Sequence, residues 1–222
     1  MEPRSGIYSG PMIVTKREHA CLVIDHEGAT LVIDPGVFTA PFTVENLVAV
    51  VITHEHPDHV TPEHLDRLLA VAPGIPLYAP AGVAASLPGY PWNTVQAGET
   101  ASPEPFALRF TGGTHAIIHS SIPVIDNLGV IVNDQLYYPG DSFTVLDEPI
   151  DALAVPASAP WLKIGEVMDF VAASQARRAF PVHEMVSSEA GRSMANGRIE
   201  HVQGLHGGSF QVLAPGESLD LG

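Results

Sequence analysis

Three histidines and an aspartate crowd into the six residues from His54 to His59, which read H-E-H-P-D-H. This cluster follows directly after the apolar run Leu47 to Thr53, which has the residue types of a buried β-strand. Imidazole nitrogens and carboxylate oxygens are ligands that zinc and similar divalent ions accept. A solvated, histidine-rich turn is the alternative, but the spacing H-x-H-x-D-H at a strand end is specific enough to favour a metal site.

Other candidate ligands occupy comparable places, each after an apolar run and beside Gly or Pro. His115 follows a run that ends at Phe110 and a Thr-Gly-Gly-Thr turn, and His119 lies four residues later. Asp141 follows a Pro-Gly pair, and His183 follows an apolar run. Each of these residues alone is more typical of a turn or a surface. Together with the first cluster they supply seven ligands, and either His115 or His119 is the third histidine.

The elements that must position these residues are short strands joined by tight turns. Runs at 20–24 and 30–34 are linked through Asp25-His26-Glu27-Gly28, which predicts an antiparallel hairpin. Further strands are expected at Met12–Val14, Leu77–Ala79, Phe106–Thr111, Leu128–Val132, Gln135–Tyr138, Ala152–Val155, a run that ends at Val182, and Phe210–Leu213.

Three helical segments are expected between these strands. Thr61-Pro62 predicts a helix start, followed by Leu65, Leu68 and Leu69 on one face, while His64 is expected in solvent. A long helix is predicted from about Gly165 to Ala179, and a short helical stretch is expected after Ser188. The apolar stripe of the long helix is Val167, Met168, Val171 and Ala172.

Composition narrows the function classes. The 222 residues are 45% hydrophobic, which suits one domain over residues 1–222. A formal charge of −15, with only 10 Lys and Arg, argues against nucleic-acid or anionic-membrane partners. Cys21 is the only cysteine, which excludes an intrachain disulfide and a thiolate zinc cluster. Residues 1–6 lack the apolar core of a signal peptide, so we expect a cytoplasmic protein that acts on a small molecule. No pattern predicts its oligomeric state.

The complete pattern resembles the metallo-β-lactamase superfamily, whose signature is an H-x-H-x-D-H loop, a third histidine after a middle strand, a Gly-Asp pair and a late histidine. The resemblance covers nearly the whole chain. The runs His19–Ile24, Leu31–Gly36 and Tyr138–Ser142 are similar to a branch of small bacterial metal-dependent hydrolases. That branch includes proteins like ascorbate-6-phosphate lactonase and N-acyl-phosphatidylethanolamine phospholipase D. The resemblance implies an α/β fold, an αββα sandwich with two inner sheets, outer helices and the site at one edge.

The resemblance also implies two metal positions. The first would be held by His54, His56 and His115, the second by Asp58, His59 and His183, and Asp141 would bridge them. On this assignment His119 would face the substrate. Asp34 is expected to accept a hydrogen bond from a ligand imidazole and so fix its tautomer.

The chemistry that follows from these ligands is hydrolysis. Two divalent ions, bridged by Asp141 and a water, would give hydroxide near neutral pH and polarise a carbonyl or phosphoryl oxygen. Asp58 would orient the hydroxide and return a proton to the leaving group. We therefore expect cleavage of a small ester, lactone or phosphodiester. Zinc is the expected metal, although manganese and iron accept the same ligands. A mono-iron dioxygenase acting on sulfur or thiols is the alternative, and the seven-ligand set favours two metals over it.

Substrate contacts are expected from loops. Trp161 and Lys163 lie in a Pro-rich segment, where Lys163 could hold an anionic group, and His119 joins them as a candidate.

Overall fold

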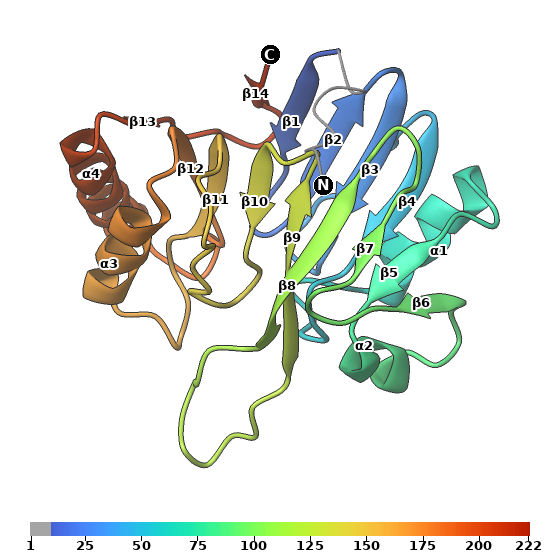
Figure 1. Ribbon diagram of the computed structural model, residues 1–222. Coiled ribbons are helices and arrows are strands. Elements are labelled where there is room, and N and C mark those ends of the chain that lie inside the picture. The colour runs from blue at the N-terminus through green and yellow to red at the C-terminus, as the bar shows by residue number, and fades with distance from the viewer. Residues whose placement is uncertain (1–9) are drawn as a thin grey trace.

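Two mixed seven-stranded sheets form the centre of the molecule within residues 10–222, which are the residues that the computed structural model describes (Figure 1). The segment inspected for a signal peptide, residues 1–6, lies outside them. In spatial order, the first sheet contains β14 (Ser218–Asp220), β1 (Met12–Lys16), β2 (Leu22–His26), β3 (Ala29–Ile33), β4 (Leu47–Val51), β5 (Leu77–Ala79) and β6 (Trp92–Thr94). The second contains β13 (Ser209–Phe210), β12 (Arg178–Val182), β11 (Ala152–Pro156), β10 (Leu136–Tyr138), β9 (Asp126–Val132), β8 (Leu108–Thr114) and β7 (Thr100–Ala101).

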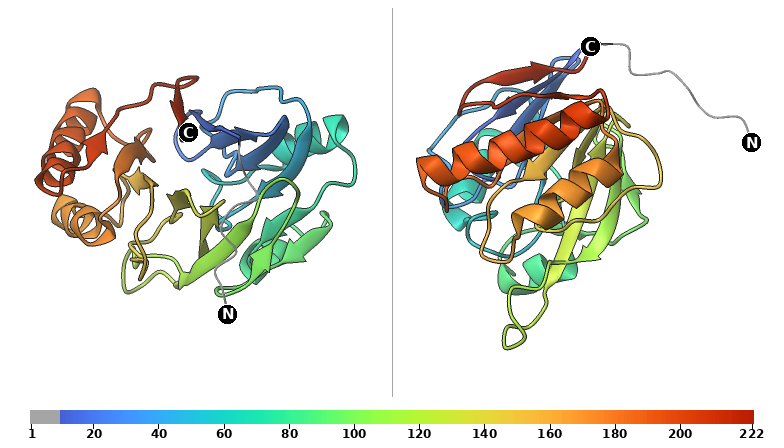
Figure 2. Two further views of the ribbon diagram at one scale, coloured as in Figure 1. Left: turned by 45° about the horizontal axis from the view of Figure 1, so that its top comes forward. Right: turned by 90° about the vertical axis from the view of Figure 1, so that its left-hand side faces the viewer.

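Helices cover the outer faces of both sheets, which completes the predicted αββα sandwich (Figure 2). Helices α1 (Pro62–Val71) and α2 (Ala81–Ser86) pack on the first sheet. Helices α3 (Ile164–Ser174) and α4 (Glu189–Leu205) pack on the second. Between the sheets lies an apolar core that includes Leu22, Leu31, Phe106, Val130 and Phe180. No helix in the described part of the chain combines the length and the apolar character that crossing a membrane requires.

The predicted opening hairpin and the first helix are confirmed. Strands β2 and β3 pair antiparallel, and Glu27 and Gly28 at their turn both have positive φ, as a two-residue hairpin turn requires. The side chain of Thr61 accepts a hydrogen bond from the His64 backbone N–H and caps α1. The prediction that His64 lies in solvent is wrong. Its side chain is buried, and its Nε2 lies 3.0 Å from the Thr39 carbonyl oxygen.

The last third of the chain departs from the sequence prediction. Helix α3 ends at Ser174 rather than near Ala179, because Gln175 adopts a left-handed conformation and Arg178–Val182 pairs parallel to β11. Helix α4 has 17 residues and is not the short stretch expected after Ser188. The predicted strand Phe210–Leu213 is also wrong, since β13 ends at Phe210 and β14 pairs with β1.

One edge of the first sheet gathers several strand ends. Strands β3, β4, β5 and β6 run parallel to one another, so their carboxyl ends lie on the same side. The chain leaves that edge through Asp34, through Thr53 and His54, and through Pro80. Side chains at the carboxyl ends of parallel strands are the usual site of ligand binding in α/β folds.

Candidate metal centre

The folded chain brings all seven predicted ligands together with one further histidine. Their nitrogen and oxygen atoms form two groups, and within each group the atoms lie within 4.8 Å of one another. One group contains His54, His56, His115 and Asp141, and the other contains His19, Asp58, His59 and His183. Each residue lies in a loop that follows a strand: β4, β8, β10, β12, or β1 for His19.

Asp141 lies between the two groups. Its Oδ2 is 3.4 Å from His115 Nε2 and 3.3 Å from His183 Nε2. Its Oδ1 is 3.4 Å from His59 Nε2. One carboxylate therefore faces histidines of both groups, which is the geometry that a bridging ligand needs.

The donor atoms converge in a way that suits cations. Nε2 of His59 and Nε2 of His183 are 3.2 Å apart, and Nε2 of His54 is 3.1 Å from Nδ1 of His56. Within residues 10–222, His115 Nε2 and Asp141 Oδ1 are buried without a hydrogen-bond partner. Buried polar atoms are rarely left unpaired, so these two fit a bound ion. Nitrogen and carboxylate donors without sulfur suit zinc, manganese or iron.

Hydrogen bonds on the far side of three rings fix their tautomers. Nδ1 of His115 lies 2.5 Å from the Ala116 carbonyl oxygen, and Nδ1 of His183 lies 2.5 Å from that of Ser158. Nδ1 of His59 lies 2.7 Å from Asp34 Oδ2. A carbonyl or carboxylate can only accept, so in each ring Nδ1 carries the proton. In the neutral ring Nε2 then carries the lone pair and faces the cluster, as a metal ligand must.

Asp34 organises the base of the cluster. Its carboxylate accepts hydrogen bonds from the Thr53 backbone N–H at 2.8 Å and from the Thr53 hydroxyl at 2.6 Å, besides that from His59. Because the Thr53 hydroxyl donates to Asp34, its oxygen is free to accept from Nδ1 of His54 at 3.0 Å. A single buried carboxylate thus orients one histidine of each group.

The charges of the cluster are strongly coupled. Burial alone would lower the pKa of His59 and of His183, but the carboxylate of Asp141 raises both, that of His183 to about 9. Burial alone would raise the pKa of Asp141, but His183 and His59 hold it well below its usual range. Burial lowers the pKa of His54 and His56. Without ions, positive charge therefore collects on the His59–His183 pair, whose Nε2 atoms lie 3.2 Å apart.

Comparison with known proteins shows which family the chain is part of. Residues 13–183 match the model of the β-lactamase superfamily domain. The chain belongs to this family. It is 38% identical over 213 residues to Protein Rv0786c of Mycobacterium tuberculosis, covering 93% of this chain and 98% of that protein. The predicted superfamily is confirmed, while its hydrolase branch and the single domain over 1–222 stay predictions.

Solved structures share the fold at low sequence identity. Igni18, a metallo hydrolase from Ignicoccus hospitalis, superposes with a TM-score of 0.71 at 18% identity, over 96% of this chain and 99% of that one. CmlA, a diiron β-hydroxylase from Streptomyces venezuelae, superposes with a TM-score of 0.70 at 14% identity, over 97% of this chain and 55% of that one. These likenesses show the β-lactamase superfamily fold, and the fold alone.

In this β-lactamase superfamily domain, His115 joins the cluster and His119 does not. Strand β8 continues through Gly112 and Gly113 to Thr114, where the sequence predicted a turn, and His115 follows directly. His119 is exposed in the long loop between β8 and β9, with Nδ1 2.8 Å from the Ser121 hydroxyl (Figure 1).

The two other predicted substrate contacts lie in different surroundings. Trp161 is buried, and its indole N–H donates to Asp141 Oδ2 at 2.9 Å, so it contacts a residue of the cluster. Lys163 is 82% exposed at the start of α3, and its ammonium group lies 3.2 Å from Glu166 Oε1. The structure does not bring Lys163 to the cluster.

Sequence reasoning did not place His19 in the cluster. It is fully buried, its Nε2 lies 3.1 Å from Asp58 Oδ2, and its ring centroid is 3.9 Å from that of His183. Its backbone, like those of Asp34 and His183, is left-handed, with φ of 60°, 49° and 68°. Such conformations are uncommon outside glycine and gather at functional sites. The available signal was a histidine directly before the buried run Ala20–Ile24.

Proposed function

We propose that this protein is a dinuclear metal-dependent hydrolase that cleaves an ester, lactone or phosphodiester bond in a small molecule. The observation that supports this most strongly is the position of Asp141 between two groups of ligand atoms. A single-metal site would need only one such group.

The chain's own residues would divide between two ions, with zinc as the first choice and manganese or iron as alternatives. The first position would be held by His54, His56 and His115, the second by Asp58, His59 and His183, and Asp141 would contact both. When bound, two divalent ions lower the pKa of a water molecule and polarise the oxygen of the scissile bond. Both effects depend on rings held in one tautomer, which Asp34 and the carbonyl groups of Ala116 and Ser158 provide.

Asp58 is the residue best placed to handle protons. Its side chain is 22% exposed, whereas those of Asp141 and His59 are nearly or fully buried. Burial alone would raise its pKa, but hydrogen bonds from His183 and His19 lower it below the usual range. An ionised carboxylate at the open side of the centre can accept a proton from water and return it to the leaving group.

Oxygenation of sulfur or thiols at a single iron is the competing proposal, and CmlA, a diiron β-hydroxylase, shows only that another protein with this fold carries iron. It predicts one ion per chain. The two separate groups of ligand atoms favour the hydrolase.

Metal content and one substitution test the proposal together. Elemental analysis of protein purified without chelator should give about two zinc or manganese ions per chain. Asp141→Ala should lose at least one ion and nearly all hydrolysis of lactones, esters and phosphodiesters, while the exposed Asp147→Ala should keep both. One iron per wild-type chain, or full activity in Asp141→Ala, would refute the dinuclear mechanism.

A further inference from the structure

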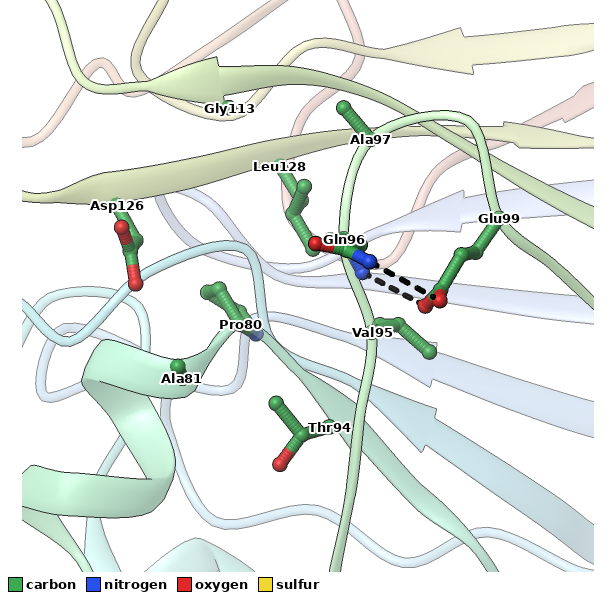
Figure 3. Close-up of a pocket in the computed structure, with 10 residues that line it drawn as sticks. All are labelled: Pro80, Ala81, Thr94, Val95, Gln96, Ala97, Glu99, Gly113, Asp126 and Leu128. Atoms are coloured by element: carbon green, nitrogen blue, oxygen red, sulfur yellow. Dashed lines mark hydrogen bonds between the residues drawn. The ribbon is translucent and has the colours of Figure 1, made fainter.

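A cavity of about 560 Å³ lies between the carboxyl ends of β5 and β6 and the strands β8 and β9 (Figure 3). This volume is in the range of small-molecule sites. Polar groups enter it from several elements, and in Figure 3 the carboxylate of Asp126 extends from β9 toward Ala81 at the start of α2. The other polar side chains that line it are Thr94, Gln96 and Glu99.

Backbone hydrogen bonds join the wall of this cavity to segments that carry candidate ligands. Leu128, which lines the cavity, donates its backbone N–H to the Thr53 carbonyl oxygen at 2.9 Å, one residue before His54. His115 donates its backbone N–H to Ile125 at 3.0 Å, one residue before Asp126. The cavity wall is therefore fixed next to the segments of His54 and His115.

Glu55 makes a third link, because it lies between the ligands His54 and His56. A methyl group placed on Gly82 would lie 2.9 Å from Glu55 Oε2 and 3.3 Å from Asp126 Oδ2. Both carboxylates therefore meet at the same end of α2. The cavity and the metal-ligand loop thus share one acidic boundary.

We propose, on the basis of the proposed hydrolase function, that this cavity holds the part of the substrate beyond the scissile bond and selects hydroxyl-bearing or cationic groups over anionic ones. Among the described residues that line it, none is Lys or Arg, whereas Asp126 and Glu99 are acidic. Glu99 is held in place by the backbone and side-chain N–H groups of Gln96, at 3.0 and 3.4 Å (Figure 3). An anionic group would meet fixed negative charge without a counter-ion.

The test uses aryl esters whose six-carbon acyl chains end in an ammonium, a hydroxymethyl or a carboxylate group, with aryl acetate as a substrate too short to enter the cavity. The wild-type kcat/KM should be at least about tenfold higher for the ammonium ester than for the carboxylate ester. Asp126→Asn and Glu99→Gln should each narrow this ratio several-fold. Glu200→Gln makes the same charge change on exposed α4, across the molecule, and should leave the ratio unchanged (Figure 1).

The outcomes separate the two proposals. If no ester is hydrolysed, including aryl acetate, the proposed function fails. If aryl acetate is hydrolysed but the three long esters react equally, or the cavity variants behave like Glu200→Gln, the cavity does not select the substrate and the inference is overturned.

His19 supports a second inference from separate observations. Its backbone is tied to the residues around His183: its N–H donates to Glu184 Oε1 at 3.2 Å, and its carbonyl accepts from the His183 N–H at 2.9 Å. Glu184 is in turn fixed by Lys16, whose buried ammonium group lies 2.6 Å from the same oxygen. His19 is therefore held rigidly beside the second group of ligands.

The ring of His19 has only one arrangement of its proton that satisfies its neighbours. The Met185 backbone N–H donates to Nδ1 at 3.1 Å, so Nδ1 carries the lone pair. The neutral ring then carries its proton on Nε2, which lies 3.1 Å from Asp58 Oδ2. His59, His115 and His183 have the opposite arrangement, with the proton on Nδ1.

We infer that His19 is a positioning residue, which donates a hydrogen bond to Asp58 and holds its carboxylate in place, and that it is not a metal ligand. A ligand nitrogen must present a lone pair to the ion, and Nε2 of His19 presents a proton instead. Its role is exerted through Asp58, the residue that we propose to handle protons.

The test compares His19→Leu, which removes the donor, with His19→Gln, whose amide N–H can replace it. Both variants should bind the same number of ions as the wild type, and the visible spectrum of the cobalt-loaded protein should keep its shape because the ligand set is unchanged. In His19→Leu, kcat should fall by about 10- to 100-fold with little change in KM. His19→Gln should recover several-fold of this loss.

Two results would overturn the assignment. Loss of one ion or a changed cobalt spectrum in either variant would make His19 a ligand. Full activity of folded His19→Leu would remove its role altogether. The metal count and the spectrum test whether His19 is a ligand even if no hydrolysis is found. Failure of the proposed function can therefore be distinguished from failure of this inference.

Discussion

Gly36 offers a sharp perturbation of the metal centre, because it packs against the backbone of the ligand loop. A methyl group at this position would lie 2.5 Å from the backbone nitrogen of His59 and closer still to the carbonyl group of Asp58. Real side-chain carbons do not approach neighbours within 3.0 Å, and neither neighbour is a flexible side chain. In Gly36→Ala the loop must therefore move by about 0.5 Å or more at a residue that supplies a ligand.

The size of this shift decides the expected effect. Metal sites tolerate deviations of only about 0.2 Å in their ligand distances, so a shift of about 0.5 Å should weaken metal binding by at least about tenfold. Overpacking costs about 1–3 kcal/mol, and about 2–4 °C in Tm per kcal/mol is expected for a chain of this size. Gly36 does not have a left-handed backbone, so the effect arises from space and not from φ.

The assay is zinc affinity by chelator competition, with Tm measured on the metal-free and the loaded protein. Gly165→Ala is the matched control, because a methyl group there has no neighbour within 4 Å and lies near the start of α3. We expect this control to keep wild-type affinity. Unchanged zinc affinity in folded Gly36→Ala would show that the loop backbone does not position the ligands, and the packing argument would be refuted.

Three further predictions concern the metal centre, and a fourth concerns Cys21. Asp34→Asn keeps the shape of the side chain but loses the charge that orients His59, so zinc affinity should fall by about 10- to 100-fold in chelator competition; an unchanged affinity would deny Asp34 this role. Metal-free protein should release at least one proton on zinc binding near neutral pH, because the His59–His183 pair, whose Nε2 atoms lie 3.2 Å apart, has raised pKa values and holds a proton until an ion displaces it; calorimetry in buffers of different ionisation enthalpy counts the protons released. The raised pKa of His183 also stabilises the metal-free protein: its contribution to the free energy of unfolding is complete below the ordinary pKa of 6.5 and is lost as the pH rises through about 9, so Tm should fall over this range. Cys21 should resist alkylation by iodoacetamide until the protein unfolds, since it is fully buried and burial raises its thiol pKa, and rapid labelling of the native protein would contradict this.

The ligands closest in sequence were the easiest to predict. His54, His56, Asp58 and His59 belong to one loop, so their proximity in space follows from their spacing. His115, Asp141 and His183 come from three other loops, and only the resemblance to a known family placed them beside the first cluster. The choice between His115 and His119 needed the structure, because it depends on strand β8 running through its pair of glycines to Thr114.

The errors near the C-terminus have a different physical cause. Helix α4 contains three glycines and buries only Ile199, Val202 and Gln203, so its apolar periodicity is weak, and packing on the second sheet stabilises it. Strand β14 pairs with β1 from the other end of the chain, as in Ile13 opposite Asp220. Neither contact is encoded in a local pattern.

His19 shows where local patterns stop being informative about function. Its position before a buried strand is visible in the sequence, but its role depends on which ring nitrogen carries the proton. The backbone N–H of Met185, 166 residues later in the chain, determines that proton's place. His19 and His183 both have a left-handed backbone. The loops that carry them are joined by backbone hydrogen bonds, and both rings face Asp58. The four candidate ligands of one loop can thus be predicted from type and spacing and the other three from the family resemblance, whereas a residue that acts through one of them becomes visible only when its hydrogen-bond partners are known.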